Sequence, residues 1–355
     1  MLASQTLPAT PRPILLIGDG GIVQDAHLPA YRLAGFPVAG IYDRNQDRAE
    51  KLAADFQIPR VFASLSDLVQ EAPAGSVFDV ALPASAFLPV LEELPAGAAC
   101  LLQKPMGEDL SQAKAILQRC REKNLVAGVN FQLRYAPAVA AARQMIREGR
   151  LGTLTDIEVN INVYTPWHLW DFLFTLPRTE ILYHSIHYLD LVRSFLGEPA
   201  GIYAKTVSHP RMTQLASVRT NMILDYGDQV RASILTNHCH LYGLEKQQSY
   251  IKFEGTLGAV IIRLGVLMDY PKGVADAFEY VFLEPGQAPV WQQQAIAGSW
   301  FPQAFIGSMA QVMLAAEGSI ARPDNSVEDA IHTMACVEAA YQSSAAGGTA
   351  IPQAF

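Results

Sequence analysis

Residues 14–23 have the sequence ILLIGDGGIV, an apolar run that leads directly into a cluster of three glycines. A short apolar run bounded by glycine is typical of a strand buried on both faces of a parallel sheet. A helical stretch follows, so the glycines form a tight strand-to-helix turn. Gly18 permits the sharp bend, and Gly20 lets a pyrophosphate approach the backbone. Gly21 and Ile22 begin the helix, whose N–H groups and dipole favour phosphates.

The turn departs from the dinucleotide-binding pattern GxGxxG, because Val23 stands where the third glycine is expected. Taken alone, such a cluster marks an ordinary turn about as often as a phosphate site. The context favours the phosphate site. The next apolar run ends in Asp43, 23 residues after Gly20, where a ribose-binding carboxylate is expected at ~20.

Asp43 is expected to accept hydrogen bonds from both adenosine ribose hydroxyls and to repel a 2′-phosphate, which favours NAD over NADP. Arg44 leaves a second interpretation open, because an arginine there can contact a 2′-phosphate or stack on adenine. A third interpretation makes Asp43 the N-cap of a helix over residues 45–55. The ribose-binding and capping roles can coexist.

The first part of the chain predicts a doubly wound parallel sheet, because short apolar runs alternate with helical stretches as far as residue 131. The clearest helix is expected over residues 109–123, where apolar residues recur every three or four positions. The expected strands cover residues 14–17, 38–42, 77–82, 98–102 and 126–131.

After residue 152 the pattern changes to strict alternation of apolar and polar residues, which is typical of antiparallel strands with one solvated face. We expect an open, mostly antiparallel sheet covered on one side by helices. Its strands are predicted at residues 157–164, 202–208, 218–225, 229–237, 250–254 and 259–264, and its helices at 179–195, 303–317 and 326–344. The fold class is therefore α/β, with a Rossmann domain over residues 1–131 and an α+β domain over residues 132–355.

Composition restricts the partners of this 355-residue chain. Half of its residues are apolar, and 26 basic against 34 acidic residues give a net charge of −8. An acidic chain without a basic run is a poor candidate for binding nucleic acid or anionic lipid. Four widely spaced cysteines, no apolar run long enough to span a membrane and no secretory signal predict a cytoplasmic protein.

Lys104 follows the expected strand 98–102, within the sequence Gln103-Lys104-Pro105. Ligands of parallel α/β sheets lie at the carboxyl ends of the strands, so Lys104 should point into the cofactor crevice. There it could hydrogen-bond a substrate hydroxyl and share its proton. The alternative is a surface lysine whose stem lies along the strand end.

Four polar residues fall on the expected helix 179–195, and their spacing predicts a shared face. His187 lies three residues after His184 and four after Tyr183, and Asp190 continues the stripe. His187 is a candidate acid/base for proton removal as hydride leaves the carbon. Packed core histidines or a metal pair are the alternatives, but a third ligand is missing, so no metal is expected. A solvated or packed pair is also the expectation for His238 and His240.

Several motifs in a fixed order resemble the Gfo/Idh/MocA family, which includes glucose–fructose oxidoreductase and inositol dehydrogenase. The matching stretches are GDGGIVQDAHLPAY (18–31), IYDRN (41–45), QKPMGEDL (103–110), NFQLRYAP (130–137), HSIHYLDLVRSFLG (184–197), FEGTLGAV (253–260) and EDAIHTMACVEAAYQSSAAG (328–347). The resemblance implies a Rossmann domain followed by an α/β domain with a large open sheet. It also implies that nicotinamide binds between the domains and that the sheet forms subunit contacts.

The resemblance assigns roles to individual residues. Lys104 binds the reacting hydroxyl and His187 is the acid/base. Pro83 and Gln103 line the nicotinamide half of the cofactor site, and Asn130 and Arg134 lie near the domain junction. Two departures matter: the family's Glu-Lys-Pro motif begins here with Gln103, and Tyr183 stands where many relatives have an aspartate. A tyrosine can relay a proton, but its usual pKa of ~10 makes it a weaker base than a carboxylate.

The loop over residues 164–170 contains several aromatic side chains. We expect Trp167 to stack on the C–H face of a sugar and His168, with His184, to bind its hydroxyls; the alternative is that they only pack the loop. These residues and the resemblance together predict a dehydrogenase of a cyclic sugar or polyol, with NAD as cofactor. Two alternatives are an enzyme with tightly bound NAD, as in oxidoreductase or glycosidase-like relatives, and a dinucleotide-sensing regulator. The resemblance further implies a homo-oligomer, a dimer or tetramer, formed through the C-terminal sheet.

Overall fold

The computed structural model describes residues 6–352, which form two compact units. The first unit contains residues up to 147 and residues 295–334, and the second contains residues 148–294 and the chain from 335 onward. Residues 132–147 and 295–334 therefore pack with the first unit. The assignment of NAD binding to residues 1–131, and of substrate binding and oligomerisation to 132–355, stays a prediction.

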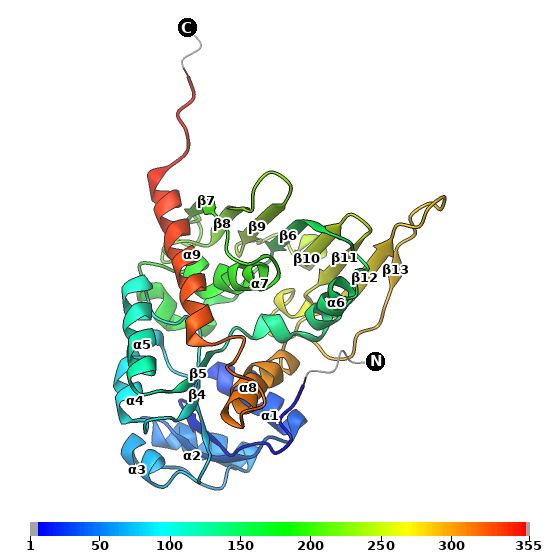
Figure 1. The fold of residues 1–355 in the computed structure, drawn as a ribbon. Helices are drawn as coiled ribbons and strands as arrows, with labels where there is room; N and C mark the ends of the chain where they lie inside the picture. The colour runs from blue at the N-terminus through cyan, green and yellow to red at the C-terminus, as the bar shows by residue number, and fades with distance from the viewer. Residues whose placement is uncertain (1–5, 353–355) are drawn as a thin grey trace. The chain divides into compact units, whose positions relative to one another are not determined.

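A five-stranded parallel sheet forms the centre of the first unit, in the order β2-β1-β3-β4-β5 (Figure 1). The strands are β1 (Ile14–Ile17), β2 (Val38–Tyr42), β3 (Val77–Val80), β4 (Ala99–Leu102) and β5 (Val126–Val129). Each agrees with a predicted strand to within a few residues, and the predicted parallel, doubly wound sheet is confirmed. The helices are α1 (Leu28–Ala34), α2 (Gln46–Phe56), α3 (Leu65–Gln70), α4 (Phe87–Glu93), α5 (Leu110–Glu122), α6 (Pro137–Arg147) and α8 (Gln303–Ala316).

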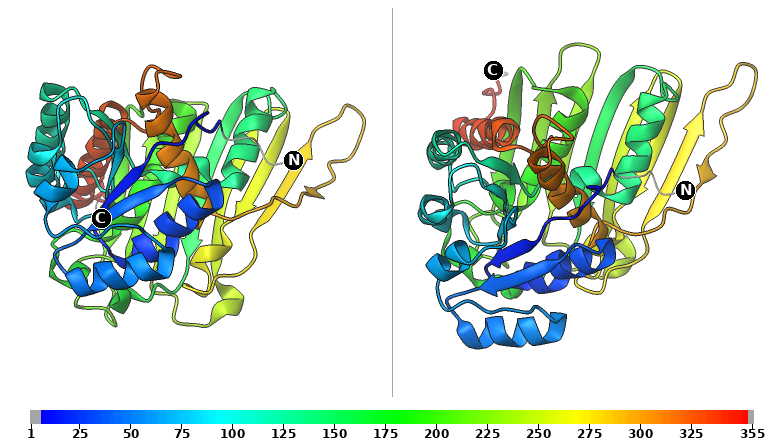
Figure 2. Two further views of the ribbon diagram at one scale, coloured as in Figure 1. Left: turned by 90° about the horizontal axis from the view of Figure 1, so that it is seen from below. Right: turned by 60° about the horizontal axis from the view of Figure 1, so that its bottom comes forward.

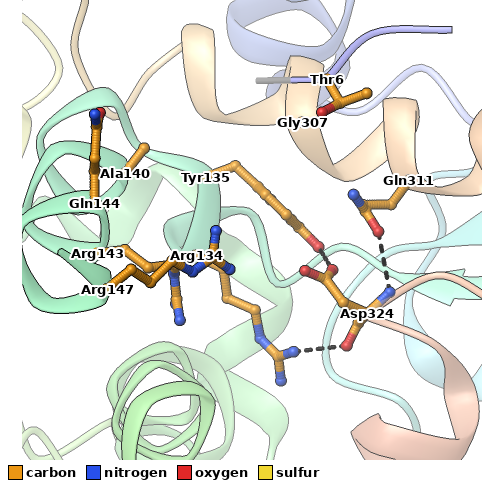
Figure 3. A pocket seen from close by; sticks show the side chains of 10 residues that line it. All are labelled: Thr6, Arg134, Tyr135, Ala140, Arg143, Gln144, Arg147, Gly307, Gln311 and Asp324. Carbon is orange, nitrogen blue, oxygen red and sulfur yellow. Dashed lines mark hydrogen bonds between the residues drawn. The ribbon is translucent and has the colours of Figure 1, made fainter. Parts of the chain in front are cut away.

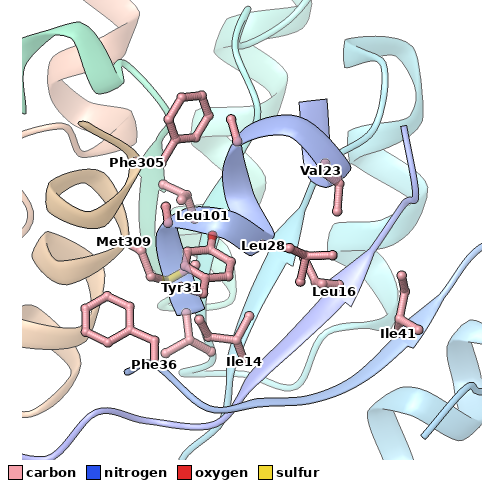
Figure 4. Close-up of a cluster of buried hydrophobic side chains, with 14 of the residues drawn as sticks. Ile14, Leu16, Val23, Leu28, Tyr31, Phe36, Ile41, Leu101, Phe305 and Met309 are labelled. Atoms are coloured by element: carbon pink, nitrogen blue, oxygen red, sulfur yellow. The ribbon is translucent and has the colours of Figure 1, made fainter. Parts of the chain in front are cut away.

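A continuous apolar cluster packs one face of this sheet against α1 and α8 (Figure 4). Ile14 and Leu16 contribute from β1, Tyr31 from α1, and Phe305 and Met309 from α8; all five are at most 1% exposed. The prediction that both C-terminal helices cover the second sheet is therefore wrong for α8. Its apolar surface completes the core of the first unit instead.

The second unit contains an eight-stranded sheet in the order β13-β12-β11-β10-β6-β9-β8-β7 (Figure 2). Neighbouring strands are antiparallel except β6 and β9, which are parallel, so the predicted open, mostly antiparallel sheet is confirmed. The strands are β6 (Leu154–Asn162), β7 (Gly201–Val207), β8 (Arg219–Asp225), β9 (Arg231–Asn237), β10 (Gln248–Gly255), β11 (Gly258–Arg263), β12 (Ala277–Phe282) and β13 (Gln292–Gln293). Sequence analysis did not predict β12 and β13.

Helical segments cover one face of this sheet: the π-helical turn η6 (Ile181–Ser185), α7 (Ile186–Leu196) and the C-terminal part of α9 (Val327–Ala346). Two serine hydroxyls of α9 also accept hydrogen bonds from backbone N–H groups of the edge strand β7. The N–H of Ala204 donates to Ser343 Oγ at 2.9 Å, and the N–H of Thr206 donates to Ser344 Oγ at 3.0 Å. An edge strand protected in this way is a poor template for another chain.

All four cysteines are buried and none forms a disulfide. Within residues 6–352, no helix combines the length and the apolar composition that crossing a membrane requires.

The packing of α8 makes a prediction about Gly307. A helical glycine usually destabilises by ~1 kcal/mol relative to alanine, but a Cβ at Gly307 would lie 2.5 Å from the Tyr135 Cβ. We expect Gly307→Ala to lower the free energy of unfolding by about 1–3 kcal/mol, because the side chains must move apart. Urea denaturation measures this change. In the control Gly201→Ala, the new Cβ meets no atom within 4 Å, and stability should stay within about 0.5 kcal/mol.

Candidate active site

The glycine turn has one sterically closed side and one open side. Gly18 has a φ of +111°, and a Cβ there would lie 2.5 Å from the carbonyl oxygen of Ala81, so only glycine fits. A Cβ on Gly20 or Gly21 would meet no atom within 4 Å. The helical stretch begins at Gly21, where its first N–H groups lack intrahelical acceptors. This open, donor-rich side fits the pyrophosphate of a dinucleotide.

Val23, which replaces the third glycine of the pattern, is completely buried in the apolar cluster of the first unit. It lies at the start of a π-helical turn, η1 (Val23–His27), which continues into α1. The departure from GxGxxG therefore adds apolar packing beneath the turn and leaves the open side unchanged.

Asp43 follows β2 and connects it to the glycine turn. Its Oδ2 accepts from the N–H of Asp19 at 3.2 Å, and its Oδ1 accepts from the N–H of Asn45 at 2.8 Å. The N-cap of α2 is Asn45, whose side chain accepts from the N–H of Arg48. The interpretation of Asp43 as the helix cap is therefore wrong. Its carboxylate lies beside the glycine turn, and its ribose-binding role stays a prediction.

A second carboxylate lies in the turn itself. Asp19 is 6% exposed, and burial, followed by the charge of Asp43, raises the pKa of its carboxyl. Arg48 opposes this effect through an ion pair of 3.1 Å with Asp19. The arginine predicted to lie at this site is Arg44; Arg48 was not predicted, although its position one turn into the predicted helix was an available signal.

The other predicted cofactor residues follow successive strands of the first sheet. Pro83 comes after β3, Gln103 and Lys104 after β4, and Asn130 after β5. The carboxyl ends of parallel strands lie on one edge of a sheet, so these residues share the edge with the glycine turn. Asn130 is completely buried.

At this edge, His27 joins two of the predicted residues. Its Nε2 lies 3.3 Å from the amide nitrogens of both Gln103 and Asn130, and its Nδ1 lies 2.7 Å from Asp79 Oδ2. Both His27 and Asp79 are completely buried. Sequence analysis missed them, although an aspartate within the buried strand β3 was a usable signal of a polar partner.

Lys104 combines partial exposure with a desolvated ammonium group. Lys104 as a whole is partly exposed. Protein atoms nevertheless surround its side chain closely enough that burial lowers the pKa of the ammonium group to about 7. Gln103 beside it is uncharged, so the carboxylate of the family motif is missing. An ammonium that titrates near neutral pH is typical of functional sites.

The predicted catalytic helix of the second unit starts with the π-helical turn η6. Tyr183 and His184 lie within this turn, whose backbone hydrogen bonds join residues five positions apart, one more than in an α-helix. His184 contacts the rings of Trp167 and His238, with centroid distances of 4.7 and 4.5 Å. His187 lies in α7 and is 7% exposed. A common face for Tyr183 and His187 stays a prediction.

A buried carboxylate supports this helix, and sequence analysis did not identify it. Glu180 is completely buried, and its Oε1 lies 3.3 Å from His238 Nε2. Burial acts to raise the pKa of Glu180, but His238 and the hydroxyls of Thr220 and Ser185 hold it below its usual value. His238 and His240, predicted to be a solvated or packed pair, lie beyond the end of β9, and both are buried.

Trp167 and His168, two predicted substrate-binding residues, line a cavity of about 320 Å³ in the second unit. The other lining residues are Tyr164, Thr165, Phe174, Arg211, Met212, Thr213, Gln214 and Leu215. Because Trp167 also contacts His184, the cavity lies next to the predicted catalytic helix. Its volume suits a small ligand.

The first unit contains a second cavity, of about 380 Å³, next to Arg134, Arg143 and Arg147 (Figure 3). Arg134 pairs with Asp329 and donates to the carbonyl oxygen of Asp324 at 2.7 Å. Burial and the neighbouring Arg134 lower the pKa of Arg143 to about 10. Arg134 thus helps to connect the end of β5 to the segment before α9.

In the described part of the chain, no group of three or more histidine, cysteine, aspartate or glutamate residues is arranged to hold a metal ion.

Comparisons with known proteins agree with this fold. A 1,5-anhydro-D-fructose reductase from Ensifer adhaerens is 26% identical over 262 residues, covering 73% of this chain and 77% of that protein. A D-apiose dehydrogenase from Rhizobium rhizogenes is 24% identical over 328 residues, covering 89% and 90%. The crystal structure of an oxidoreductase from Agrobacterium radiobacter, in complex with NAD⁺, L-tartaric acid and magnesium, has a TM-score of 0.75 at 21% identity. It covers 95% of this chain and 97% of that chain.

Two domain families match consecutive parts of the sequence. Residues 13–131 match the oxidoreductase family with an NAD-binding Rossmann fold, and residues 139–261 match the C-terminal domain of the same family. The first match contains the glycine turn, Asp43 and Lys104, and the second contains His187. The chain is therefore a member of the Gfo/Idh/MocA family of oxidoreductases, with an NAD-binding Rossmann fold.

Proposed function

We propose that the protein is an NAD-dependent dehydrogenase that acts on a hydroxyl group of a cyclic sugar or polyol. The observation that carries the proposal is Lys104: its desolvated side chain follows β4, at the sheet edge that also holds the glycine turn and Asp43. The substrate class is supported by relatives named for 1,5-anhydro-D-fructose and D-apiose.

Two carboxylates support NAD over NADP: Asp43, which follows β2, and Asp19, which lies in the glycine turn after β1. Asp43 lies against the turn, and Asp19 lies close enough that the charge of Asp43 raises its pKa. A 2′-phosphate at this position would meet two carboxylates. Arg48 is already paired with Asp19.

In the proposed reaction, three side chains bind the reacting hydroxyl or transfer its proton: Lys104, His187 and Tyr183. Lys104, as an ammonium, donates a hydrogen bond to the reacting oxygen and stabilises the negative charge that develops on it. His187 removes the hydroxyl proton, and Tyr183 is the proposed relay beside it. NAD, when bound, accepts the hydride from the carbon or returns it in the reverse direction.

The cavity at Trp167 is the proposed site for the rest of the sugar. An indole face suits the C–H face of a ring, and the imidazoles of His168 and His184 suit its hydroxyls. The outer face of the second sheet is the proposed subunit interface, since Tyr203, Ile223 and Leu235 are at least 40% exposed on it.

The first test of this function removes each proposed catalytic side chain. We expect Lys104→Ala and His187→Ala each to lower kcat/KM by about 100- to 10,000-fold, while the Kd for NAD changes less than about threefold. The assay follows NADH formation over aldoses, inositols and aldonates. Lys114→Ala, an exposed lysine of α5, is the matched control. An unchanged rate in Lys104→Ala contradicts the site assignment, and tight NAD binding without turnover of any sugar favours a regulator.

The second test uses the pKa of about 7 of Lys104. If the ammonium is the active form, kcat/KM for oxidation should fall about tenfold per pH unit once the pH rises above that pKa. Lys104→Arg should be slower but should lose this alkaline limb, because a guanidinium stays charged. A rate that rises through pH 7 in the wild type but not in Lys104→Arg indicates that Lys104 acts as a neutral base instead.

The third test concerns the choice of cofactor. Asp43→Ser removes a charge that repels a 2′-phosphate, so the ratio of kcat/KM with NADP to that with NAD should rise about 10- to 100-fold. Asp55→Ser, at an exposed position near the end of α2, serves as the control and should leave the ratio unchanged. A ratio that stays constant in Asp43→Ser indicates that another residue selects the cofactor.

A further inference from the structure

We propose that His27 is a positioning residue for Lys104: a neutral imidazole that transmits the orientation of Asp79 through Gln103 to the Lys104 backbone. The inference rests on the proposed function in so far as Lys104 is the residue that binds substrate. It concerns a histidine that no motif spacing singled out and that lies outside the predicted site.

The Lys104 end of this network has a fixed polarity. The main-chain N–H of Lys104 donates to Gln103 Oε1 at 2.8 Å, and a backbone N–H can only donate. The carboxamide oxygen must therefore face Lys104. The Gln103 amide nitrogen, as a donor, then faces His27 Nε2 at 3.3 Å.

The hydrogen bonds of the His27 imidazole continue the same donor-to-acceptor order, from Lys104 toward Asp79. Its Nε2 meets NH₂ groups of both Gln103 and Asn130, so Nε2 must be the acceptor and carry no proton. The other nitrogen, Nδ1, lies 2.7 Å from Asp79 Oδ2, and a carboxylate only accepts. Nδ1 therefore carries the proton, and the ring is neutral.

The Tyr31 hydroxyl also faces His27, with its oxygen 3.4 Å from Nδ1. Tyr31 donates its hydroxyl to the same Asp79 Oδ2 at 2.7 Å, and the Phe305 ring of α8 lies 5.0 Å from the imidazole. Asp79 and Tyr31 are thus the titratable groups that face the ring. His27 and Asp79 are completely buried, so bulk solvent does not compete for these hydrogen bonds.

This network explains how the chain accommodates glutamine in place of the family's glutamate. A glutamate at position 103 would present a carboxylate to Nε2, and the ring would need a second proton. The net charge of the three groups is −1 in either case: Asp79 alone with a neutral His27, or two carboxylates with an imidazolium. With Gln103, that charge lies on Asp79, which His27 and Gln103 separate from the Lys104 backbone.

The decisive experiment is nitrogen NMR of the [¹⁵N]histidine-labelled full chain. We expect His27 to give the chemical shifts of a ring protonated at Nδ1 alone, and Gln103→Glu to give those of a ring protonated at both nitrogens. His27→Gln identifies the signal by its loss. Tyr31→Phe provides a second identification if that variant fails to fold, because it removes one donor to Asp79. A wild-type His27 that is an imidazolium or carries its proton on Nε2 overturns the proposal.

Kinetics supply the second readout. Gln103→Glu should move the alkaline limb of the pH–rate profile upward by about one unit, since a neighbouring anion favours the ammonium of Lys104. His27→Gln should lower kcat about 10- to 100-fold through misplacement of Lys104, with KM for NAD within about twofold. An unchanged kcat and pH profile in both variants contradicts the positioning role. If His27 has the expected form but Lys104→Ala keeps full activity, the proposed function fails and the network stands.

Discussion

The close approach of Gly18 to the end of β3 determines the arrangement of the polar groups in the first unit. No side chain fits between Gly18 and the carbonyl of Ala81. The chain therefore turns close against the end of β3 before the helical stretch begins. Nine residues later in the chain, His27 meets Asp79, a residue of β3 that precedes Ala81 by two positions. The open side of the turn at Gly20 and Gly21 and the buried hydrogen bonds of His27 therefore both follow from one steric contact.

Burial pattern made the strands of the first sheet predictable. Short apolar runs such as residues 14–17 are buried on both faces, and glycine, proline or aspartate bounds each one, so their positions agree closely with the structure. The same reasoning did not identify the partner of α8. Its apolar residues indicate burial, but Phe305 and Met309 fit against either sheet as far as composition is concerned. The choice depends on the shape of the surface left open beside α1.

Site residues that follow a strand of the parallel sheet could be predicted from the sequence, whereas contacts between residues far apart in the sequence could not. Asp43, Gln103 and Asn130 could be placed because each follows a parallel strand. The pairs His27–Asp79 and Glu180–His238 could not, since 52 and 58 positions separate their members. Two π-helical turns, at Val23–His27 and Ile181–Ser185, also interrupt the periodicity on which helical-face arguments rest. The first turn contains His27, which lies against Asp79, and the second contains His184, whose ring contacts His238.

The return of the chain to its first unit has a consequence for synthesis on the ribosome. One face of the parallel sheet is covered by α8, which comes after the whole second sheet in the sequence. Until residue 316 has been translated, side chains such as Ile14 and Tyr31 lack part of their final packing. The nucleotide-binding half, although encoded first, therefore lacks part of its core until α8 has been synthesised, and a nascent chain would expose apolar surface that chaperones recognise.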